Sequence, residues 1–471
     1  MSADAIRDAL SRVVGPRNLL AEPKDMAPFV TDWTGKYTGS ACAVVLPGST
    51  NEVAAVLKVC AEYGCPVVPQ GGHTSLSGGA TPDASGRAVV LSLRRMAGSL
   101  SVDPLGMTAR VSAGVTLQQV HEAAEENGLL FPLAMSSQGS AMIGGVIATN
   151  AGGISVLRYG PMRSLVLGLE VALPDGRIWE GTTALRKDNT GLDLRDLFIG
   201  SEGTLGVITG AVLRLVPRPT SRYTAVVALA DIGAALTLLQ RMRQHCGDRL
   251  SAFEYLERPA LDLIARFVPD VRLPFADLPP ALVLLECTDT MDAGQLRDLC
   301  DVALGEAIES GLAEDALIAA NEAQREAFWL MRESISQALV RVGKTAKHDI
   351  SLPIDRLAEF VTRAGDRVAL TVPGAQSIVF GHLGDGNLHY NVIGPNFTAD
   401  EAFYARHAVL AGAVHDLVLG HGGSISAEHG VGQLRAAELA RLKPPLDLAL
   451  MRQIKAVFDP DGRMNPGKLF V

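Results

Sequence analysis

The feature that most constrains this chain is the segment Gly381–Asn391, which reads Gly-His-Leu-Gly-Asp-Gly-Asn-Leu-His-Tyr-Asn. β-Branched and aromatic residues precede and follow it, and Asp385-Gly386 between them is a strong signal for a two-residue hairpin turn. A turn centred there predicts that His382 lies directly across from His389, with Cβ atoms about 5 Å apart. Asn391 shares the face of His389 because strand side chains alternate. The sequence therefore predicts a β-hairpin that holds two imidazoles in chelating geometry.

A third metal ligand is predicted from the later loop Ser424–Gly432, which contains Glu428 and His429. Two histidines and one carboxylate leave open positions on a divalent ion, as a catalytic Zn²⁺ or a related transition metal requires. A structural zinc would need four closed ligands. In the alternative interpretation the hairpin histidines are a cross-strand polar pair and Glu428-His429 is a solvated turn. The combination favours a metal held by His382, His389 and Glu428.

Three segments rich in glycine and small residues lie before the middle of the chain. Gln70–Ala80 follows the short strand Pro66–Pro69, and its glycines and hydroxyls suit a diphosphate, although it is neither a Walker A loop nor a Rossmann fingerprint. Ser137–Gly153 is small enough for a helix–helix contact or for a wall against a flat ring system. Leu197–Thr209 leads into a strand. Together the three segments suggest one long ligand threaded between them.

Strand and helix signals alternate along the chain, with a domain boundary predicted at Pro217–Pro219. Beyond it, the order of elements favours an antiparallel sheet with helices on one face. Capping boxes are expected at Ser49 with Glu52 and at Thr116 with Gln119. The predicted strands are Ala41–Leu46, Thr108–Val111, Ala225–Leu229, Ala252–Leu256 and Ala281–Thr288, a hairpin turn is predicted at Pro174–Gly176, and the predicted helices are Met1–Val14, Ala234–His245, Asn321–Val342, Asp400–Leu419 and Leu446–Phe458.

The predicted helix Asn321–Val342 carries a candidate anion site. Arg332 and Ser336 are four residues apart, hence on one face, and Lys347 follows the helix. The alternative is an exposed Arg332–Glu333 surface with solvated lysines, and spacing alone slightly favours this alternative.

Composition excludes several classes of protein. With 471 residues the chain should form two or three domains, and 48% apolar with 20% charged residues is typical of globular proteins. The net charge of −9, without a basic cluster, argues against nucleic acid and anionic membrane surfaces as partners. The six cysteines lack a CxxC spacing, so we expect small core residues rather than an iron–sulfur cluster or a disulfide framework. Without a signal peptide or an apolar span, we expect no stable membrane insertion and a cytoplasmic location.

Taken together, these motifs resemble the FAD-dependent dehydrogenases of the vanillyl-alcohol oxidase type, which have a PCMH-type FAD-binding domain. The resemblance lies in the D-2-hydroxyacid branch, which contains D-2-hydroxyglutarate dehydrogenase, D-lactate dehydrogenase and glycolate oxidase subunits. It extends over nearly all 471 residues, and its most specific part is Gly381–Asn391 combined with Ala427–Gly432. It implies an α+β fold with a two-subdomain FAD-binding domain at 1–218, an antiparallel-sheet substrate (cap) domain with the metal hairpin at 219–425, and a C-terminal helical segment at 426–471 that packs back on the FAD domain.

The resemblance also implies roles for individual residues. The metal ligands are His382, His389 and Glu428, the metal is expected to be zinc, and His429 is the catalytic base. Substrate is bound by Arg332, Ser336, Lys347, Asn391 and His429, with Ser336 in place of a frequent threonine. The implied FAD-binding residues are Pro69, Gln70, Gly71, Gly72, His73, Thr74, Ser75, Ser77, Gly78, Gly79, Ser137, Gly139, Ser140, Gly144, Gly145, Thr149, Asn150, Gly152, Gly153, Glu202, Gly203, Gly206, Ile208, Asn465 and Lys468.

One position departs from the pattern of this family. His73 stands where members often have asparagine, and in some distant relatives a histidine in this loop is joined covalently to the flavin. We expect non-covalent binding here, with His73 donating to the diphosphate.

The implied reaction is oxidation of a D-2-hydroxy acid to the 2-oxo acid. The metal lowers the pKa of the substrate hydroxyl, His429 takes its proton, and hydride passes to flavin N5. Arg332 and Lys347 would fix a second carboxylate, which favours D-2-hydroxyglutarate or D-malate over lactate. An electron-transfer flavoprotein or a quinone is the expected acceptor, and a homodimer is the expected assembly.

Three alternatives remain open from the residues. D-lactate or glycolate oxidation would use the same chemistry on a smaller acid. A metal-dependent hydrolase would need only the metal ligands and leaves the glycine-rich segments unexplained. A non-catalytic nucleotide-binding module would keep those segments and treat the histidines as structural.

Overall fold

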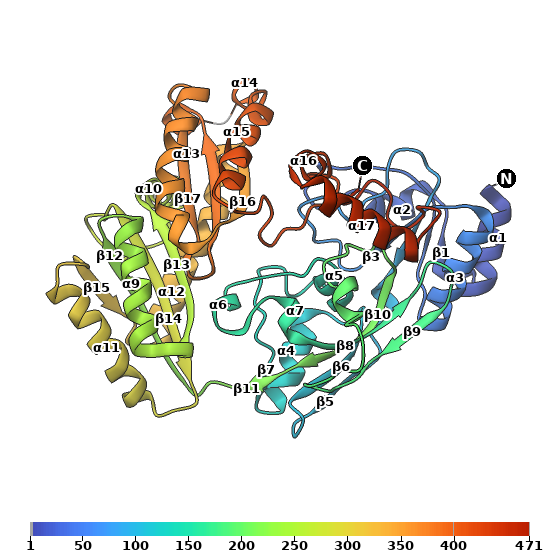
Figure 1. The fold of residues 1–471 in the computed structure, drawn as a ribbon, viewed down its shortest axis with the longest axis horizontal. Coiled ribbons are helices and arrows are strands. Elements are labelled where there is room, and N and C mark those ends of the chain that lie inside the picture. Colours follow the sequence, from blue (N-terminus) through green and yellow to red (C-terminus); the bar gives the residue numbers. More distant parts are fainter. Residues whose placement is uncertain (1–2, 399, 471) are drawn as a thin grey trace. The chain divides into compact units, whose positions relative to one another are not determined.

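The computed structural model describes residues 3–398 and 400–470, and the chain forms two compact units (Figure 1). The first unit contains the residues up to Gly153, Gly160–Arg218 and the residues from Glu428 onward. The second contains Ile154–Tyr159 and Pro219–Ala427. The predicted α+β fold is confirmed. No helix in the described part of the chain is long and apolar enough to cross a membrane.

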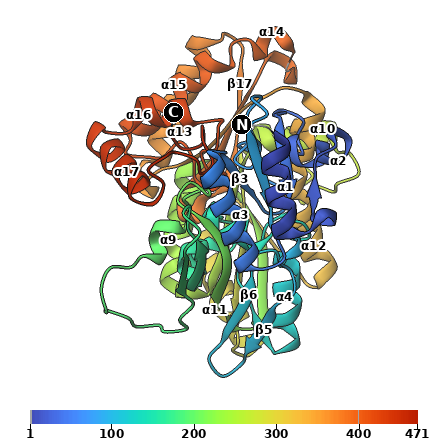
Figure 2. The same ribbon diagram turned by 90° about the vertical axis from the view of Figure 1, so that its right-hand side faces the viewer.

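A four-stranded sheet begins the first unit, in the order β1-β2-β4-β3, with β2 and β3 both parallel to β4. These strands are Leu19–Leu20, Ala41–Val45, Ala88–Ser92 and Val67–Gln70 for β1, β2, β4 and β3. The helices α1 (Ala3–Val14) and α3 (Thr50–Tyr63) lie side by side (Figures 1 and 2). Ser49 caps α3 as predicted by accepting from the Glu52 N–H, but the Glu52 carboxylate accepts from Gly48 instead of completing the capping box.

A five-stranded antiparallel sheet follows in the first unit, in the order β5-β6-β10-β8-β9. Its strands β5, β6, β8, β9 and β10 are Leu100–Asp103, Thr108–Ser112, Val166–Ala172, Ile178–Gly181 and Val207–Arg214. The predicted capping box of Thr116 and Gln119 is confirmed, and it begins α4 (Leu117–Glu126). One apolar core joins both sheets, since it contains Val89 of β4 and Val207 of β10.

The remaining elements of the first unit are short, apart from the C-terminal helix. They are α2 (Pro23–Val30), β7 (Leu129–Leu130), α5 (Ile143–Ala148), α7 (Met162–Leu165), α8 (Arg195–Phe198), β11 (Val216–Pro217), α16 (Ala436–Leu442) and α17 (Pro445–Phe458).

The second unit is built on a seven-stranded sheet in the order β15-β12-β14-β13-β17-β18-β16, in which every neighbouring pair is antiparallel. Its strands β12 to β18 are Ser221–Leu229, Leu250–Glu257, Ala281–Asp289, Asp315–Ile318, Ala346–Ser351, Gln376–His382 and Asn387–Ile393. Its helices are α6 (Val156–Tyr159), α9 (Ile232–Cys246), α10 (Arg258–Phe267), α11 (Ala293–Glu309), α12 (Glu322–Val342), α13 (Leu357–Thr371), α14 (Glu401–Tyr404) and α15 (His407–Gly420).

The prediction of helices on one face of this sheet is wrong. On β14, Leu284 packs in one core cluster with Leu261 of α10 and Ile335 of α12. Cys287, three residues further along the strand, instead meets Cys246 of α9 and Cys300 of α11. Because side chains alternate along a strand, these residues lie on opposite faces, so α10 and α12 cover one face and α9 and α11 the other.

Two predicted elements also differ from the structure. The predicted helix Asp400–Leu419 is interrupted between α14 and α15, although Asp400 does cap α14. The hairpin does not turn on Asp385-Gly386 alone, because a 3₁₀ turn at Leu383–Asp385 precedes Gly386, whose φ is 87°. The pairing is therefore Phe380 with His389, so the predicted pairing of His382 with His389 is wrong.

Candidate functional site

The predicted site residues that belong to strands of the second unit lie on one face of its sheet. Across β16 and β18, Lys347 pairs with Asn391 and Asp349 pairs with His389. His389 in turn pairs with Phe380 of β17. Directly opposed residues share a face, as do residues two apart on one strand. The pairing register therefore brings the predicted substrate residues Lys347 and Asn391 close to the predicted metal ligand His389.

His382 and His389 still meet, although they are not directly opposed. His382 follows Phe380 by two residues, so it is the diagonal neighbour of His389 on the same face. The two ring centroids are 5.6 Å apart, with the ring planes at 74°. The predicted proximity of the two imidazoles is thus found, but it arises from a diagonal relationship.

Glu254 of β13 orients His382 from within the core. Its side chain is 0% exposed, and its Oε1 lies 2.5 Å from His382 Nδ1. Burial by itself raises the pKa of Glu254, but the charges of His382 and Arg332 lower it to about 2. An ionised carboxylate can only accept, so His382 donates from Nδ1 and keeps Nε2 for another partner.

Arg332 binds the other oxygen of the same carboxylate. Its Nε donates to Glu254 Oε2 at 2.7 Å, and its guanidinium carbon lies 5.2 Å from the centroid of the Phe380 ring. The alternative of an exposed Arg332–Glu333 surface is wrong, since the Arg332 side chain is buried. Because Nε is committed to Glu254, a substrate carboxylate would be bound by the terminal guanidinium nitrogens.

The other predicted substrate residues differ in their surroundings. Ser336, one turn after Arg332 on α12, is exposed, whereas Asn391 is buried. Lys347 is exposed, but the surrounding protein desolvates its ammonium group enough to lower its pKa. Among the described residues no carboxylate forms an ion pair with Lys347, so its charge is available to an anion. Lys344, by contrast, pairs with Glu401 at 2.5 Å.

His382 and His389 meet within the second unit, whereas the third predicted ligand, Glu428, belongs to the first. Glu428 begins the last segment of the first unit and directly follows Ala427, whose N–H donates to the Asp349 carbonyl. This set of two imidazoles and one carboxylate is the donor chemistry that suits a divalent transition metal. The two histidines are therefore close together, and the donor chemistry of the predicted set fits such an ion.

Asp349 is a candidate site residue that the sequence analysis missed. Asn387 donates to its Oδ1 at 3.0 Å, and His389 Nδ1 lies 3.9 Å from the same oxygen. A signal was present, because Asp349 lies two residues after Lys347 on a strand and hence on the same face.

The three small-residue segments meet in the first unit. A Cβ on Gly72 would lie 1.9 Å from the Ser140 carbonyl oxygen, and one on Gly71 would lie 3.5 Å from Gly145. A Cβ on Gly203 would lie 3.1 Å from the Pro69 ring. These contacts allow no side chain at Gly72, and they bring the segments together as the single-ligand interpretation requires.

The C-terminal segment of the first unit contacts these loops. The Glu202 carboxylate accepts from the N–H groups of Val431 and Gly432, at 2.7 Å each. Ser77 donates its hydroxyl to the His429 carbonyl at 2.7 Å, and Asn465 donates to the carbonyls of Gly79 and Glu202. Glu202 and Ser77 therefore use their side chains to hold the loop that follows Glu428.

Several features of these loops fit a flavin nucleotide. Gln70 Oε1 and Asn465 Oδ1 are buried and have no hydrogen-bond partner among the described residues, so they could accept from N–H or O–H groups of a ligand. Lys468 is 3% exposed and desolvation lowers its pKa, which makes a nearby anion favourable. Left-handed backbone conformations occur at His73, Asn150, Glu202 and Asn465. Such strain in non-glycine residues clusters at binding sites.

His73 uses both ring nitrogens within the protein. Nδ1 lies 3.3 Å from the Pro28 carbonyl oxygen and Nε2 lies 3.2 Å from the Thr81 hydroxyl. Burial lowers the pKa of the imidazole. The ring therefore does not point a spare nitrogen at a diphosphate, and a contact with FAD from this residue would come from its backbone.

Comparison with known proteins identifies the family. Residues 41–182 match the family described as FAD binding domain, and residues 218–469 match FAD linked oxidases, C-terminal domain. The second match alone covers more than half of the chain. The chain belongs to the FAD-linked oxidases. The expected FAD-dependent oxidoreductase of the vanillyl-alcohol oxidase type is thus confirmed.

Relatives that match nearly the whole of this FAD-linked oxidase are known. It is 39% identical over 462 residues to the mitochondrial D-2-hydroxyglutarate dehydrogenase of Bos taurus, covering 98% of this chain and 82% of the relative. It is 33% identical over 453 residues to a D-2-hydroxyglutarate–pyruvate transhydrogenase of Saccharomyces cerevisiae, covering 95% and 90%. A crystal structure of p-cresol methylhydroxylase with substrate bound matches with a TM-score of 0.77 at 16% identity, over 99% of this chain and 96% of that one. This last similarity supports the fold alone.

Proposed function

We propose that this FAD-linked oxidase oxidises D-2-hydroxyglutarate to 2-oxoglutarate with the help of a divalent metal. The observation that carries the proposal is the single sheet face on which Lys347 accompanies the hairpin histidines, and to which Arg332 of α12 is joined through Glu254. Two relatives whose names state D-2-hydroxyglutarate as substrate support the choice of acid.

The residues of this face can divide the work between the two ends of the substrate. A divalent ion held by His382, His389 and Glu428 would supply Lewis acidity, and FAD would accept the hydride. Asn391 would hold the reacting end of the substrate. The terminal nitrogens of Arg332 and the ammonium group of Lys347 bind the distal carboxylate and fix its orientation.

His429 is the proposed catalytic base. Its Nε2 lies 3.8 Å from Glu428 Oε1, so base and ligand come from adjacent residues with distinct positions. The imidazole takes the substrate hydroxyl proton on a ring nitrogen, which leaves hydride departure from C2 as the remaining step.

The proposed binding of a distal carboxylate by Arg332 and Lys347 also predicts which acids are preferred. A monocarboxylate such as D-lactate or glycolate would leave Lys347 without an anion, so oxidation of these acids is the less favoured alternative. D-malate retains both carboxylates but is shorter by one methylene, and we propose it as a slower substrate. A metal-dependent hydrolase, the alternative of another class, would not use the loops around Gly72.

The proposal extends to the partners. An electron-transfer flavoprotein or a quinone would reoxidise the flavin, and the similarity to a transhydrogenase adds a 2-oxo acid as a second class of acceptor. We further propose a cytoplasmic homodimer, with residues 1–218 as the FAD domain, 219–425 as the substrate domain and 426–471 packing back on the former.

Anaerobic titration of the purified holoenzyme tests the function. D-2-hydroxyglutarate should bleach the flavin bands, D-malate should do so more slowly, and the L enantiomer, D-lactate and glycolate should have little effect. A chelator should abolish bleaching, and Zn²⁺ should restore it. Equal bleaching by D-lactate would favour the monocarboxylate alternative, and a preparation that binds no flavin would refute the oxidase reaction.

A further inference from the structure

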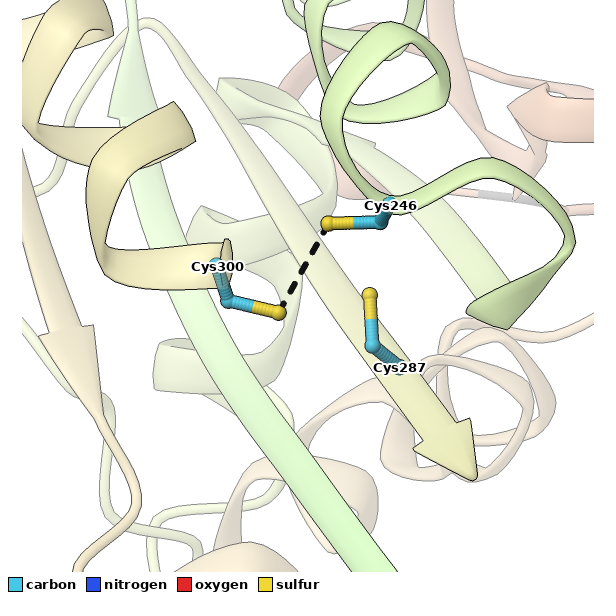
Figure 3. Close-up of side chains that lie close together, drawn as sticks. All are labelled: Cys246, Cys287 and Cys300. Atoms are coloured by element: carbon cyan, nitrogen blue, oxygen red, sulfur yellow. Dashed lines mark hydrogen bonds between the residues drawn. The ribbon is translucent and has the colours of Figure 1, made fainter. Parts of the chain in front are cut away.

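Three cysteines that are far apart in the sequence meet inside the second unit (Figure 3). Cys246 ends α9, Cys287 lies on β14 and Cys300 lies on α11. All three are 0% exposed, and their sulfur atoms lie within 4.8 Å of one another. The sequence prediction of scattered core cysteines is therefore incomplete, because these three form one cluster.

The spacing of the sulfur atoms is that of a chelate. Cys246 Sγ and Cys300 Sγ are 3.7 Å apart. Two thiolates about 2.3 Å from one ion are separated by about 3.8 Å at a tetrahedral angle and by about 4 Å at a trigonal angle. A disulfide would instead require about 2 Å, and all six cysteines of the chain are free.

We propose that Cys246, Cys287 and Cys300 form a three-coordinate site for a soft, thiophilic cation of the Cu(I) class. Thiolates select such ions over harder ones. Among the described residues the cluster contains no histidine or carboxylate as a fourth ligand, which disfavours a closed tetrahedral zinc site.

An entry route lies at the end of α9. Cys246 is followed by Gly247, with φ of 55°, and by Asp248, and both of these residues are exposed. A local opening of this helix end would expose the nearest sulfur without disturbing the sheet.

The cluster is separate from the proposed reaction. Glu254 pairs with Leu284 of β14, which faces α10 and α12, whereas Cys287 faces α9 and α11. An ion bound by the cysteines therefore lies on the opposite face of the sheet from the hairpin histidines, and its binding should leave the flavin chemistry unchanged.

Anaerobic titration of the zinc-loaded holoenzyme with Cu(I), against a chromophoric Cu(I) chelator, tests the proposal. We expect one tightly bound equivalent and a rise in Tm. Cys287→Ser should weaken binding by more than the roughly 10- to 100-fold typical of losing an outer-shell partner. Cys60→Ser, at an equally buried cysteine of the first unit, should bind as the parent does. Unchanged binding in Cys287→Ser, or equal loss in Cys60→Ser, would overturn the site.

A second measurement keeps the test valid if Cys287→Ser does not fold. Bound Cu(I) should protect Cys246 and Cys300 of the parent protein from alkylation, as read by mass spectrometry of peptides, and should leave the labelling of Cys65 unchanged. No protection, or equal protection of Cys65, would also refute the proposal.

Discussion

Glu254 Oε1 lies 2.5 Å from His382 Nδ1, so a fully buried carboxylate holds one of the proposed metal ligands. The other oxygen of the same carboxylate binds Arg332, the proposed anchor of the substrate carboxylate. Glu254 therefore positions both His382 and Arg332, which are proposed to act at opposite ends of the substrate. Both side chains would lose this orientation if Glu254 were changed.

We predict that Glu254→Gln weakens metal binding about 10- to 100-fold, as is typical for an outer-shell partner of a ligating histidine. An amide can no longer accept charge-assisted hydrogen bonds from His382 and Arg332 together. Metal content after dialysis against graded chelator gives the affinity, and KM for D-2-hydroxyglutarate gives the effect on Arg332. Glu257→Gln, on the same strand but three residues on, should leave both quantities unchanged. Parental metal affinity in Glu254→Gln would contradict the positioning role.

The pKa of Glu254 predicts an acid-dependent part of the stability. It is lowered from an ordinary value of 4.5 to about 2, so the ionised group contributes stability fully above pH 4.5 and loses it as the pH falls towards 2. The contribution at neutral pH is about 3 kcal/mol. Chemical unfolding of metal-free protein at several pH values should show a stability advantage over Glu254→Gln that shrinks between pH 4.5 and 2. A constant difference across that interval would contradict the linkage.

Lys347 offers a cleaner test of substrate choice than Arg332. Arg332→Ala would leave Glu254 buried with one partner fewer, which costs about 3–5 kcal/mol of stability when a buried pair is broken. Lys347 is exposed, and within the described part of the chain it supports no such pair. Lys347→Ala should raise KM for D-2-hydroxyglutarate about 10- to 100-fold, the value of a charge-assisted hydrogen bond, and leave that for D-lactate nearly unchanged. Lys344→Ala, which removes an exposed pair with Glu401 and a contact with the Tyr404 ring, is the matched control. Equal losses for both acids would refute the anchor role.

The local structure was largely predictable from sequence, whereas the partners of the buried charges were not. The Thr116 capping box depends on residues three apart, so the sequence contains all of it. The predicted pairing register of the hairpin was wrong because Leu383 and Gly384 belong to a 3₁₀ turn. The Asp385-Gly386 dipeptide alone does not indicate this turn. The prediction that His382 and His389 lie close together was nevertheless correct, because diagonal and directly opposed residues share a face of the sheet.

The remaining features that the sequence did not predict depend on contacts between residues far apart along the chain. Glu254 is 78 residues from Arg332 and 128 from His382 along the chain, and nothing in its own strand distinguishes it from an ordinary polar residue. The cysteine cluster likewise joins α9, β14 and α11, so only the order of the strands brings its members together.

The environment of His73 predicts that FAD is held without a covalent bond. Both ring nitrogens already contact protein atoms, and attachment of the flavin would break one of these contacts. Acid precipitation should therefore release all yellow colour into the supernatant, as measured by its absorbance. His73→Asn should retain FAD, because the backbone of the loop remains. A yellow pellet in the parent protein would contradict this expectation.

Asp349 is a candidate site residue that was found only from the structure. Its carboxylate lies 3.9 Å from Nδ1 of His389, so it can orient this proposed metal ligand. Asp349→Asn keeps the shape but removes the charge, and we predict about 10- to 100-fold weaker metal binding with flavin content unchanged. Asp355→Asn, at an exposed carboxylate of the same unit, is the control. Parental metal affinity with a lowered kcat would instead assign Asp349 to the base His429, because a partner of the base alone would not alter retention of the ion.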